Sequence, residues 1–229
     1  MVALHKLDLC PGKNVDGVNY KFLGIISKNR VEWGISALAC MSSSVSIVPF
    51  YESLGADVIA FVLNQTELTT ICCENAKYLN TIMGLKRAGK IPKLLNVITF
   101  DQVGKDKREE AEALDLKVYY FQDLIEIGKQ EVDVVLEEPK PETIYMICYT
   151  SGTTGDPKGV MIAHESFVSL IHLADQFMVN FDETDIAISY LPYGHTFEQC
   201  IFIFSLFKGF SHGYYSGDPL QLFDDIQEL

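Results

Sequence analysis

The stretch YTSGTTGDPKGV, residues 149–160, carries residue types that bind phosphate. Its glycines allow positive φ angles and a close approach of the backbone to a ligand. Its hydroxyls and backbone N–H groups can converge on an anion, and Lys158, beside the rigid Pro157, adds a positive charge. Hydrogen bonds to charged groups contribute roughly 1.5–3 kcal/mol each, so we predict a polyphosphate site. The residues predicted to form it are Thr150, Ser151, Gly152, Thr153, Thr154, Gly155 and Lys158.

The stretch matches none of three common functional loops. A Walker A loop needs Ser or Thr after its lysine, whereas Gly159 follows Lys158. A hydrolase elbow needs G-x-S-x-G around its serine, and Ser151 does not stand in that pattern. The sequence also contains no G-x-G-x-x-G dinucleotide fingerprint. Ser151 is therefore predicted to bind rather than to act as a nucleophile.

The elements around this loop predict a sheet that presents it at an edge. Residues 143–150 (TIYMICYT) read as a buried strand that runs into the loop, and residues 159–164 (GVMIAH) as a strand that returns. Upstream, short apolar runs alternate with amphipathic ones, which is typical of βα units. Such proteins bind ligands at the carboxyl ends of their strands. We therefore predict an α/β fold with a parallel or mixed sheet.

The same alternation gives the remaining elements. Strands are predicted at 21–27, 45–50, 68–73, 94–100, 117–121, 185–192 and 211–217, and helices at 29–43, 56–66, 76–89, 105–114, 165–178, 196–209 and 219–229. The first of these helices is expected to face inward with Trp33, Ile35, Leu38 and Ala39. His164, Glu165 and His172 are interpreted as cap and surface residues. Two prolines and a run of acids predict a linker near residues 131–142.

Composition bounds the class of protein. Hydrophobic residues make up 48 % of the 229 residues and charged ones 21 %, which is typical of a globular protein. A net charge of −13 argues against a nucleic-acid partner. The six cysteines show no C-x-x-C pair and no zinc spacing, so we expect reduced, buried thiols. Neither a signal peptide nor a transmembrane segment is predicted.

Taken together, these residues resemble a known family. YTSGTTGDPKGV is similar to the phosphate-binding signature of the adenylate-forming (AMP-binding) superfamily, and LPYGHTFEQ, residues 191–199, resembles its next motif. Residues 24–33 (GIISKNRVEW) and 48–67 (VPFYESLGADVIAFVLNQTE) resemble the long-chain fatty acid–CoA ligase branch. The resemblance covers residues 20–229. It implies the α/β fold of the large N-terminal domain of these enzymes.

The resemblance also implies a chemistry and residue roles. A fatty carboxylate attacks the α-phosphorus of ATP to form an acyl adenylate, and the thiol of coenzyme A then displaces AMP. By resemblance, residues 150–155 cradle the phosphates and Lys158 acts on their β/γ side. Thr153 or Thr154 would lie near Mg²⁺. His195 would lie beside the reacting carboxylate, with Tyr193 and Phe197 lining the entrance to the acyl site.

The resemblance further predicts an incomplete unit. We expect residues 1–229 to be part of an AMP-binding domain without the small C-terminal domain, inactive alone and with exposed apolar surface. Two alternatives stay open: a non-catalytic binding or regulatory module, and a ligase of the same superfamily for another carboxylic acid. The expected location is intracellular, cytoplasmic or peripheral on an organelle membrane such as the endoplasmic reticulum or peroxisome.

Overall fold

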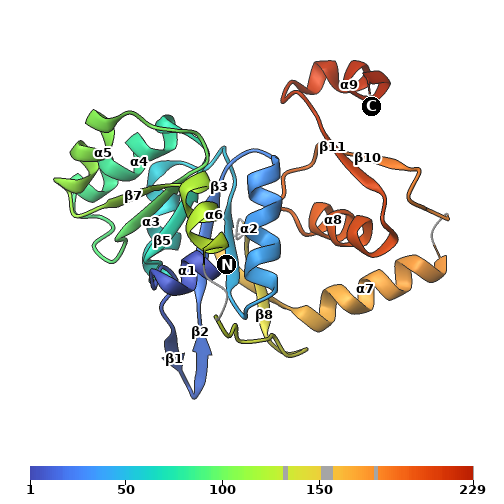
Figure 1. Ribbon diagram of the computed structural model, residues 1–229, viewed down its shortest axis with the longest axis horizontal. Coiled ribbons are helices and arrows are strands. Elements are labelled where there is room, and N and C mark those ends of the chain that lie inside the picture. Colours follow the sequence, from blue (N-terminus) through green and yellow to red (C-terminus); the bar gives the residue numbers. More distant parts are fainter. Residues whose placement is uncertain (131–133, 151–156, 178–179, 229) are drawn as a thin grey trace.

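A seven-stranded sheet organises the chain, as the computed structural model shows (Figure 1). The structure describes residues 1–130, 134–150, 157–177 and 180–228. Its strands, in spatial order, are β7 (Lys117–Tyr120), β6 (Asn96–Thr99), β5 (Thr70–Cys73), β3 (Phe22–Ile26), β4 (Ser46–Phe50), β8 (Ile144–Thr150) and β9 (Lys158–Ala163). All neighbouring pairs are parallel except β8–β9, which is antiparallel. The predicted α/β fold with a mostly parallel sheet is confirmed.

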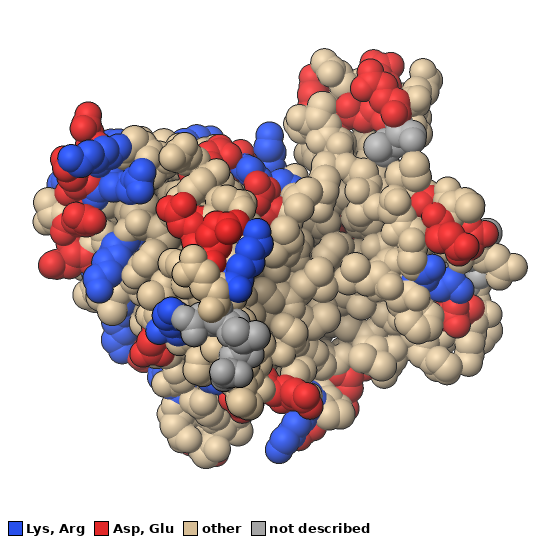
Figure 2. Space-filling view, in the orientation of Figure 1, with Lys and Arg blue, Asp and Glu red and all other residues tan. Residues whose placement is uncertain are grey.

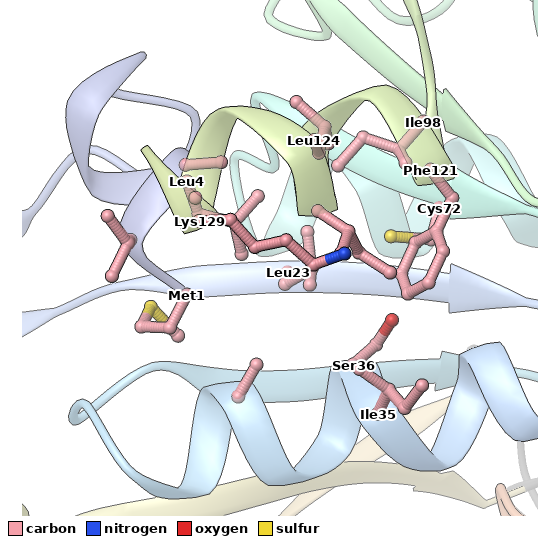
Figure 3. Close-up of a pocket in the computed structure, with 15 residues that line it drawn as sticks. Met1, Leu4, Leu23, Ile35, Ser36, Cys72, Ile98, Phe121, Leu124 and Lys129 are labelled. Carbon is pink, nitrogen blue, oxygen red and sulfur yellow. The ribbon is translucent and has the colours of Figure 1, made fainter. Parts of the chain in front are cut away.

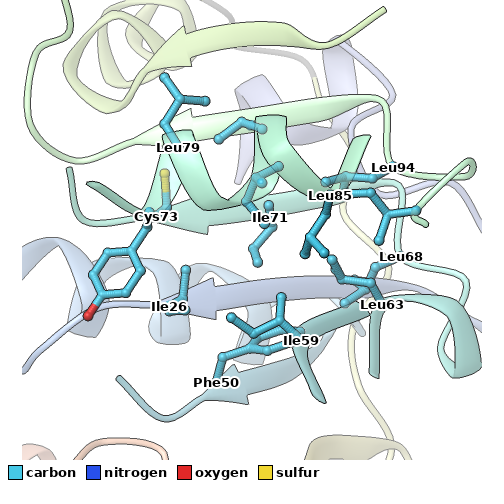
Figure 4. Close-up of a cluster of buried hydrophobic side chains, with 14 of the residues drawn as sticks. Ile26, Phe50, Ile59, Leu63, Leu68, Ile71, Cys73, Leu79, Leu85 and Leu94 are labelled. Atoms are coloured by element: carbon cyan, nitrogen blue, oxygen red, sulfur yellow. The ribbon is translucent and has the colours of Figure 1, made fainter. Parts of the chain in front are cut away.

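Two layers of helices cover the sheet, because its central strands are apolar on both faces. One face packs against α3 (Ala56–Gln65), α4 (Ala76–Arg87) and α5 (Lys105–Glu112), and the other against α1 (Val2–Lys6), α2 (Val31–Met41) and α6 (Phe121–Lys129). Strand β5 shows the alternation: Ile71 and Cys73 point into the first layer and Cys72 into the second. Figure 4 shows the first core, with Ile71 among side chains from α3 and α4.

The chain continues from β9 into a second group of elements. These are α7 (His164–Phe177), β10 (Ile186–Ser189), α8 (Thr196–Lys208), β11 (Ser211–Tyr214), the 3₁₀ turn η1 (Pro219–Gln221) and α9 (Leu222–Glu228). β10 and β11 form a parallel pair of their own. Helix α8 ends at Gly209, whose φ of 86° is the left-handed conformation that glycine adopts without a steric cost. In Figure 1 this group extends away from the sheet, with α9 at its upper end.

Most predicted elements are confirmed, and some details of the prediction are wrong. Trp33 and Ala37 of α2 are buried, but Ile35 and Leu38 are 42 % and 36 % exposed. The reason is that α2 contributes Trp33, Ala37 and Cys40 to the second core, while Gly34 faces Phe202 of α8. Sequence patterns also missed α6, α1 and the hairpin of β1 (Lys13–Val15) and β2 (Val18–Tyr20).

The remaining sequence predictions concern cysteines, the linker and the membrane. All six cysteines are free, and Cys40, Cys72, Cys73 and Cys148 are buried. Residues 134–140 of the predicted linker form neither helix nor strand, and the chain then returns to the same sheet as β8. Across the described ranges, no helix has both the length and the apolar character needed to cross a bilayer.

Candidate functional site

The predicted phosphate loop is closed at its base by a pair of strands. Thr150, the last residue of β8, lies opposite Lys158, the first residue of β9, in the antiparallel ladder. Both side chains are exposed at the carboxyl edge of β8. Ser151, Gly152, Thr153, Thr154 and Gly155 lie outside the described residues. The two ends of the loop are thus held together, and Lys158 lies at the base of the loop.

The space around Gly159, immediately after Lys158, favours a residue without a side chain. A Cβ atom at this position would lie 3.0 Å from Cγ2 of Ile147 and 3.2 Å from Cζ of Tyr149. Both neighbours are on β8, where Tyr149 pairs directly with Gly159. A Cβ here would force these side chains to move by a few tenths of an ångström. The sequence predicted a positive φ or a close approach to a ligand for the loop glycines; Gly159 does not have a positive φ, and its close approach is to side chains of β8.

His195 lies at the start of α8 and has a defined ring orientation. It is the N-cap residue of the helix, and its Nδ1 accepts a hydrogen bond from the backbone N–H of Phe197 at 3.1 Å. In the neutral ring the proton is therefore on Nε2, which is free to donate. The side chain is exposed. The motif thus presents an N–H donor at the surface rather than a histidine packed in a core.

Tyr193 and Phe197, the two predicted acyl-site residues, have different surroundings. Tyr193 is 1 % exposed, and its ring centroid lies 5.0 Å from that of Trp33. Its hydroxyl lies 3.2 Å from that of Tyr214. Phe197 is 55 % exposed on the first turn of α8. Of this pair, only Phe197 presents its ring to solvent in this structure.

The segment before His195 is attached to the sheet at three neighbouring strands. Asn29, after β3, bonds with residues 189–193, while Tyr51, after β4, donates to the carbonyl of Gly194 at 3.3 Å. The thiol of Cys148, on β8, donates to the same carbonyl at 3.4 Å. Cys148 stands two residues before Thr150, and Gly194 one residue before His195. The two sequence motifs therefore meet at one edge of the sheet.

The protonation states at this contact follow from burial. Burial, followed by the neighbouring Cys148, raises the pKa of Tyr51 to about 12. Burial also raises the pKa of the Cys148 thiol. At neutral pH both groups keep their protons, so both can donate to the Gly194 carbonyl. The residues that make these contacts, Asn29, Tyr51 and Cys148, were not predicted as site residues from the sequence. Asn29 and Tyr51 do stand within the stretches that carried the family resemblance.

Behind this segment lies a buried polar network. Gln199 of α8 accepts a hydrogen bond from the Tyr145 hydroxyl at 2.6 Å and donates to the carbonyl of Tyr193 at 2.7 Å. Ser189 donates to the carboxyl of Glu198 at 2.5 Å. Burial raises the pKa of Glu198. Because Gln199 and Glu198 are almost completely buried, these bonds fix α8 against β8 and β10.

A pocket of about 240 Å³ opens where the two motifs meet. It lies beside the ends of β3 and β4 and the segment before His195; its lining residues include Lys28, Tyr51, Glu52, Tyr190, Pro192 and Gly194. The carboxyl edge of a sheet is the usual position for a ligand in an α/β fold.

His164, predicted as a cap or surface residue, is instead half-buried. Its ring packs against Tyr145, and its Nε2 has no hydrogen bond within the described part of the chain.

Two other features of the described residues carry less chemistry. An apolar cavity of about 300 Å³ lies between α2 and α6, lined by Leu23, Ile35, Cys72 and Phe121 among others (Figure 3). Its ionisable side chain Lys129 bonds to Glu126 at 2.8 Å. No group of three His, Cys, Asp or Glu residues that could hold a metal ion occurs in the ranges given above.

Comparison with known proteins agrees with these observations. A family model described as AMP-binding enzyme matches residues 17–229. Long-chain-fatty-acid–CoA ligase 5 of Mus musculus is 35 % identical over 212 residues, which are 91 % of this chain and 31 % of the mouse protein. Long chain acyl-CoA synthetase 4 of Arabidopsis thaliana is 34 % identical over 211 residues, 90 % of this chain and 31 % of the plant protein. This chain thus spans about a third of the length of these curated relatives.

Solved structures share the fold at lower identity. The adenylation domain of the carboxylate reductase from Mycobacterium chelonae superposes with a TM-score of 0.81 at 17 % identity, over 98 % of this chain and 35 % of that one. The anthranilate CoA ligase AuaEII, solved with anthranoyl-AMP, gives a TM-score of 0.77 at 18 % identity, over 98 % of this chain and 39 % of that one. These likenesses establish the architecture of the sheet and its helices.

Proposed function

The chain belongs to the AMP-binding enzyme family, and from this premise we propose that it forms part of an ATP-dependent long-chain fatty acid–CoA ligase. The proposed reaction has two steps: the fatty carboxylate attacks the α-phosphorus of ATP and releases pyrophosphate, and the thiol of coenzyme A then displaces AMP from the acyl adenylate. We propose that this chain supplies the phosphate loop and the segment that carries His195. We also propose that the chain alone does not convert substrate.

One observation carries the proposal: the two motifs meet at the carboxyl edge of β8. The thiol of Cys148 contacts Gly194, which brings the end of β8 next to the segment that leads to His195. A phosphate held between Thr150 and Lys158 would therefore have an N–H donor, the His195 ring, presented from a neighbouring segment. Such fixed donors stabilise the charge that develops on a transferring phosphate.

The roles of individual residues follow from this arrangement. Thr150 and residues 151–155 would donate to the phosphates, and Lys158, exposed beside them, would neutralise charge on the β/γ side. His195 would donate from Nε2 to an oxygen of the reacting carboxylate or phosphate. Phe197, with its exposed ring, and Tyr193, from its buried position against Trp33, would line the entrance to the acyl site.

Mg²⁺ would be held partly by a loop hydroxyl. The hydroxyl oxygens of Thr153 and Thr154 are hard ligands of the kind Mg²⁺ prefers, and the metal keeps most of its other positions for phosphate and water. When bound, it would neutralise charge on the transferring phosphate. We therefore propose that the metal binds at this loop.

The identity of the carboxylic acid substrate is proposed from the names of similar proteins. Curated relatives at 32–35 % identity are named for long-chain fatty acids, which favours a fatty acid here. The anthranilate CoA ligase shares the fold, so an aryl or shorter acid is the second candidate. We further propose a location in the cytoplasm or at the surface of an organelle membrane. Competition between palmitate and benzoate, and cell fractionation, would separate these possibilities.

The test of the ligase proposal uses Lys158 and a matched lysine. Native polypeptide carrying these residues is sized by immunoblot and assayed for acyl-CoA formation from ATP, CoA and palmitate. Lys158→Ala should lower the rate at least about 10-fold, since one lost charge-assisted hydrogen bond is worth roughly 1.5–3 kcal/mol. Lys105→Ala, at a side chain 85 % exposed on α5, should leave it unchanged.

Two results would overturn the ligase proposal. The first is a native product near 25.7 kDa that binds ATP but forms no acyl-CoA, which would favour the non-catalytic module. The second is equal activity of the Lys158→Ala and Lys105→Ala variants, which would remove the loop from the reaction.

A further inference from the structure

The side chain of Asn29 links the end of β3 to the segment that leads into α8. Its Nδ2 donates to Oγ of Ser189 at 2.9 Å and to the carbonyl of Leu191 at 2.6 Å. Its Oδ1 accepts from the backbone N–H of Tyr193 at 2.7 Å. We propose that Asn29 is a positioning residue that sets the place of His195 in the site, an inference that rests on the proposed function.

An asparagine is the side chain that this geometry requires. The amide is 7 % exposed, and it both donates twice and accepts once within the segment 189–193. Aspartate keeps the acceptor but loses both donors, and alanine loses all three bonds. Either change removes this donor from the half-buried Leu191 carbonyl, and alanine also leaves the buried N–H of Tyr193 without this acceptor, which costs more than the bond itself contributes.

Each residue from Tyr193 to His195 has a backbone group that is hydrogen-bonded. After the bonds at Leu191 and Tyr193, the carbonyl of Gly194 is held by Tyr51 and Cys148, and the N–H of His195 donates to the carbonyl of Pro192 at 2.8 Å. A Cβ on Gly194 would lie 3.3 Å from Cβ of Pro49, so the segment rests closely on β4. A shift at Tyr193 is therefore transmitted two residues along, to His195.

Asn29 also lies at the pocket rather than in the general core. It lines the 240 Å³ pocket together with Lys28 and Gly194. Asn96 provides the contrast, because it is equally buried at 8 % exposure but bonds to Thr70 within the sheet, remote from either motif. If buried amides merely stabilised this fold, the two asparagines would behave alike. The positioning role predicts that they differ.

The experiment compares Asn29→Ala, Asn29→Asp and Asn96→Ala in two measurements. The first follows amide hydrogen exchange of Tyr193 and His195 in the 229-residue chain. Asn29→Ala should speed exchange at Tyr193 at least about 10-fold, and Asn29→Asp should have a smaller effect because it keeps the acceptor. Asn96→Ala should leave exchange at both residues unchanged.

The second measurement takes kinetic constants for acyl-CoA formation by the native polypeptide. Asn29→Ala should lower kcat about 10- to 100-fold, as expected for a displaced catalytic group, with KM for ATP within about twofold. Asn29→Asp should recover part of the loss, and Asn96→Ala should keep the wild-type kcat. A merely structural role would instead lower the active fraction equally in Asn29→Ala and Asn96→Ala.

The outcomes separate this inference from the proposed function. Unchanged exchange at Tyr193 in Asn29→Ala, or faster exchange with an unchanged kcat, would overturn the positioning role. A wild-type polypeptide without acyl-CoA formation would instead overturn the proposed function. Hydrogen exchange would then still decide whether Asn29 fixes the segment that carries His195.

Discussion

The sheet body, residues 1–150 together with β9 (Lys158–Ala163), and the later region, residues 164–228, bury their apolar side chains to different extents. The described part of the sheet body contains two large cores, one on each face of the sheet. The later region has one small cluster of its own, formed by Ile171, Phe204 and Phe210. Most of the large hydrophobic side chains that are exposed in the described residues also belong to the later region.

The difference shows where the later region obtains its stability. Three of its buried aromatic residues, Phe167, Tyr193 and Phe202, belong to the second core of the sheet, which also contains Trp33 of α2, rather than to its own cluster. Its segment 189–194 is bonded to Asn29, Tyr51 and Cys148 of the sheet body. The later region thus holds the candidate histidine in place through contacts with the sheet body. In the face seen in Figure 2, charged side chains gather over the sheet body, and the surface between the two regions shows few.

The largest predicted effect comes from the centre of the sheet body. Ile71→Ala removes a side chain that is 0 % exposed in the first core, and the cavity it leaves should lower the free energy of unfolding by about 3 kcal/mol. Urea unfolding followed by the fluorescence of Trp33, the one tryptophan, would measure this. Ile186→Ala, at a side chain 49 % exposed in the later region, should change it by less than about 0.5 kcal/mol. Equal effects would show that the two regions are packed alike.

A somewhat smaller effect is expected at the junction of the two regions. Gln199→Leu keeps the volume of a completely buried side chain but leaves the Tyr145 hydroxyl and the Tyr193 carbonyl without this partner. Each buried group left unpaired costs about 1–3 kcal/mol, so we expect a loss of about 2 kcal/mol.

Gln122→Leu, on the exposed face of α6, is the matched control. It should keep the wild-type urea midpoint. A Gln199→Leu variant as stable as this control would mean that the buried network does not join α8 to β8.

The sequence predicted the parallel strands of the sheet body and most of their helices, for physical reasons, but it missed α1, α6 and the β1–β2 hairpin of the same body. The strands of the body are continuous apolar runs, and its helices carry ordinary caps, such as Asn75 before α4 and Gly89, with a φ of 68°, after it. Such local signals suffice where burial is complete. The stripe of α2 was misjudged because small residues rather than Ile35 and Leu38 face the sheet.

In the candidate site, too, local features were predicted from the sequence and long-range contacts were not. The motifs predicted Lys158 and His195 as site residues, because their residue types and spacing are local. The contacts that join the motifs, from Asn29, Tyr51 and Cys148 to the segment 189–194, connect residues far apart in the sequence. No periodicity within either stretch encodes that pairing, since it depends on which strands become neighbours. The order β3–β4–β8 brings these three residues to one edge.

A pH-dependent effect distinguishes the later region further. Burial lowers the pKa of His212 from 6.5, and its ring packs among Tyr193, Phe202 and Phe210. The unfolded chain therefore binds this proton at a higher pH than the folded chain, so stability is lost as pH falls through about 6.5.

His212→Phe keeps the aromatic packing and should flatten the fall in unfolding free energy between about pH 7 and pH 5. Urea unfolding at several pH values would measure the slope, and taking the difference from the wild type cancels the opposite contribution of Glu198, whose raised pKa favours acid. His5→Phe, at an exposed position on α1, is the control. A His212→Phe slope equal to the wild-type slope would count against the buried ring as its cause.

The smallest effect on stability, and the clearest on association, is expected at the exposed aromatic residues of the later region. Phe177 on α7 and Phe223 on α9 are each 79 % exposed, so Phe177→Ser and Phe223→Ser should change the unfolding free energy by less than about 0.5 kcal/mol. They should nevertheless reduce self-association and the binding of an apolar dye, because contiguous exposed apolar surface drives both. Analytical ultracentrifugation over a concentration series would measure the first. Val18→Ser, in the hairpin of the sheet body at 51 % exposure, should leave association unchanged. If it reduced association as much as the two later changes, the contrast between the regions would not extend to their surfaces.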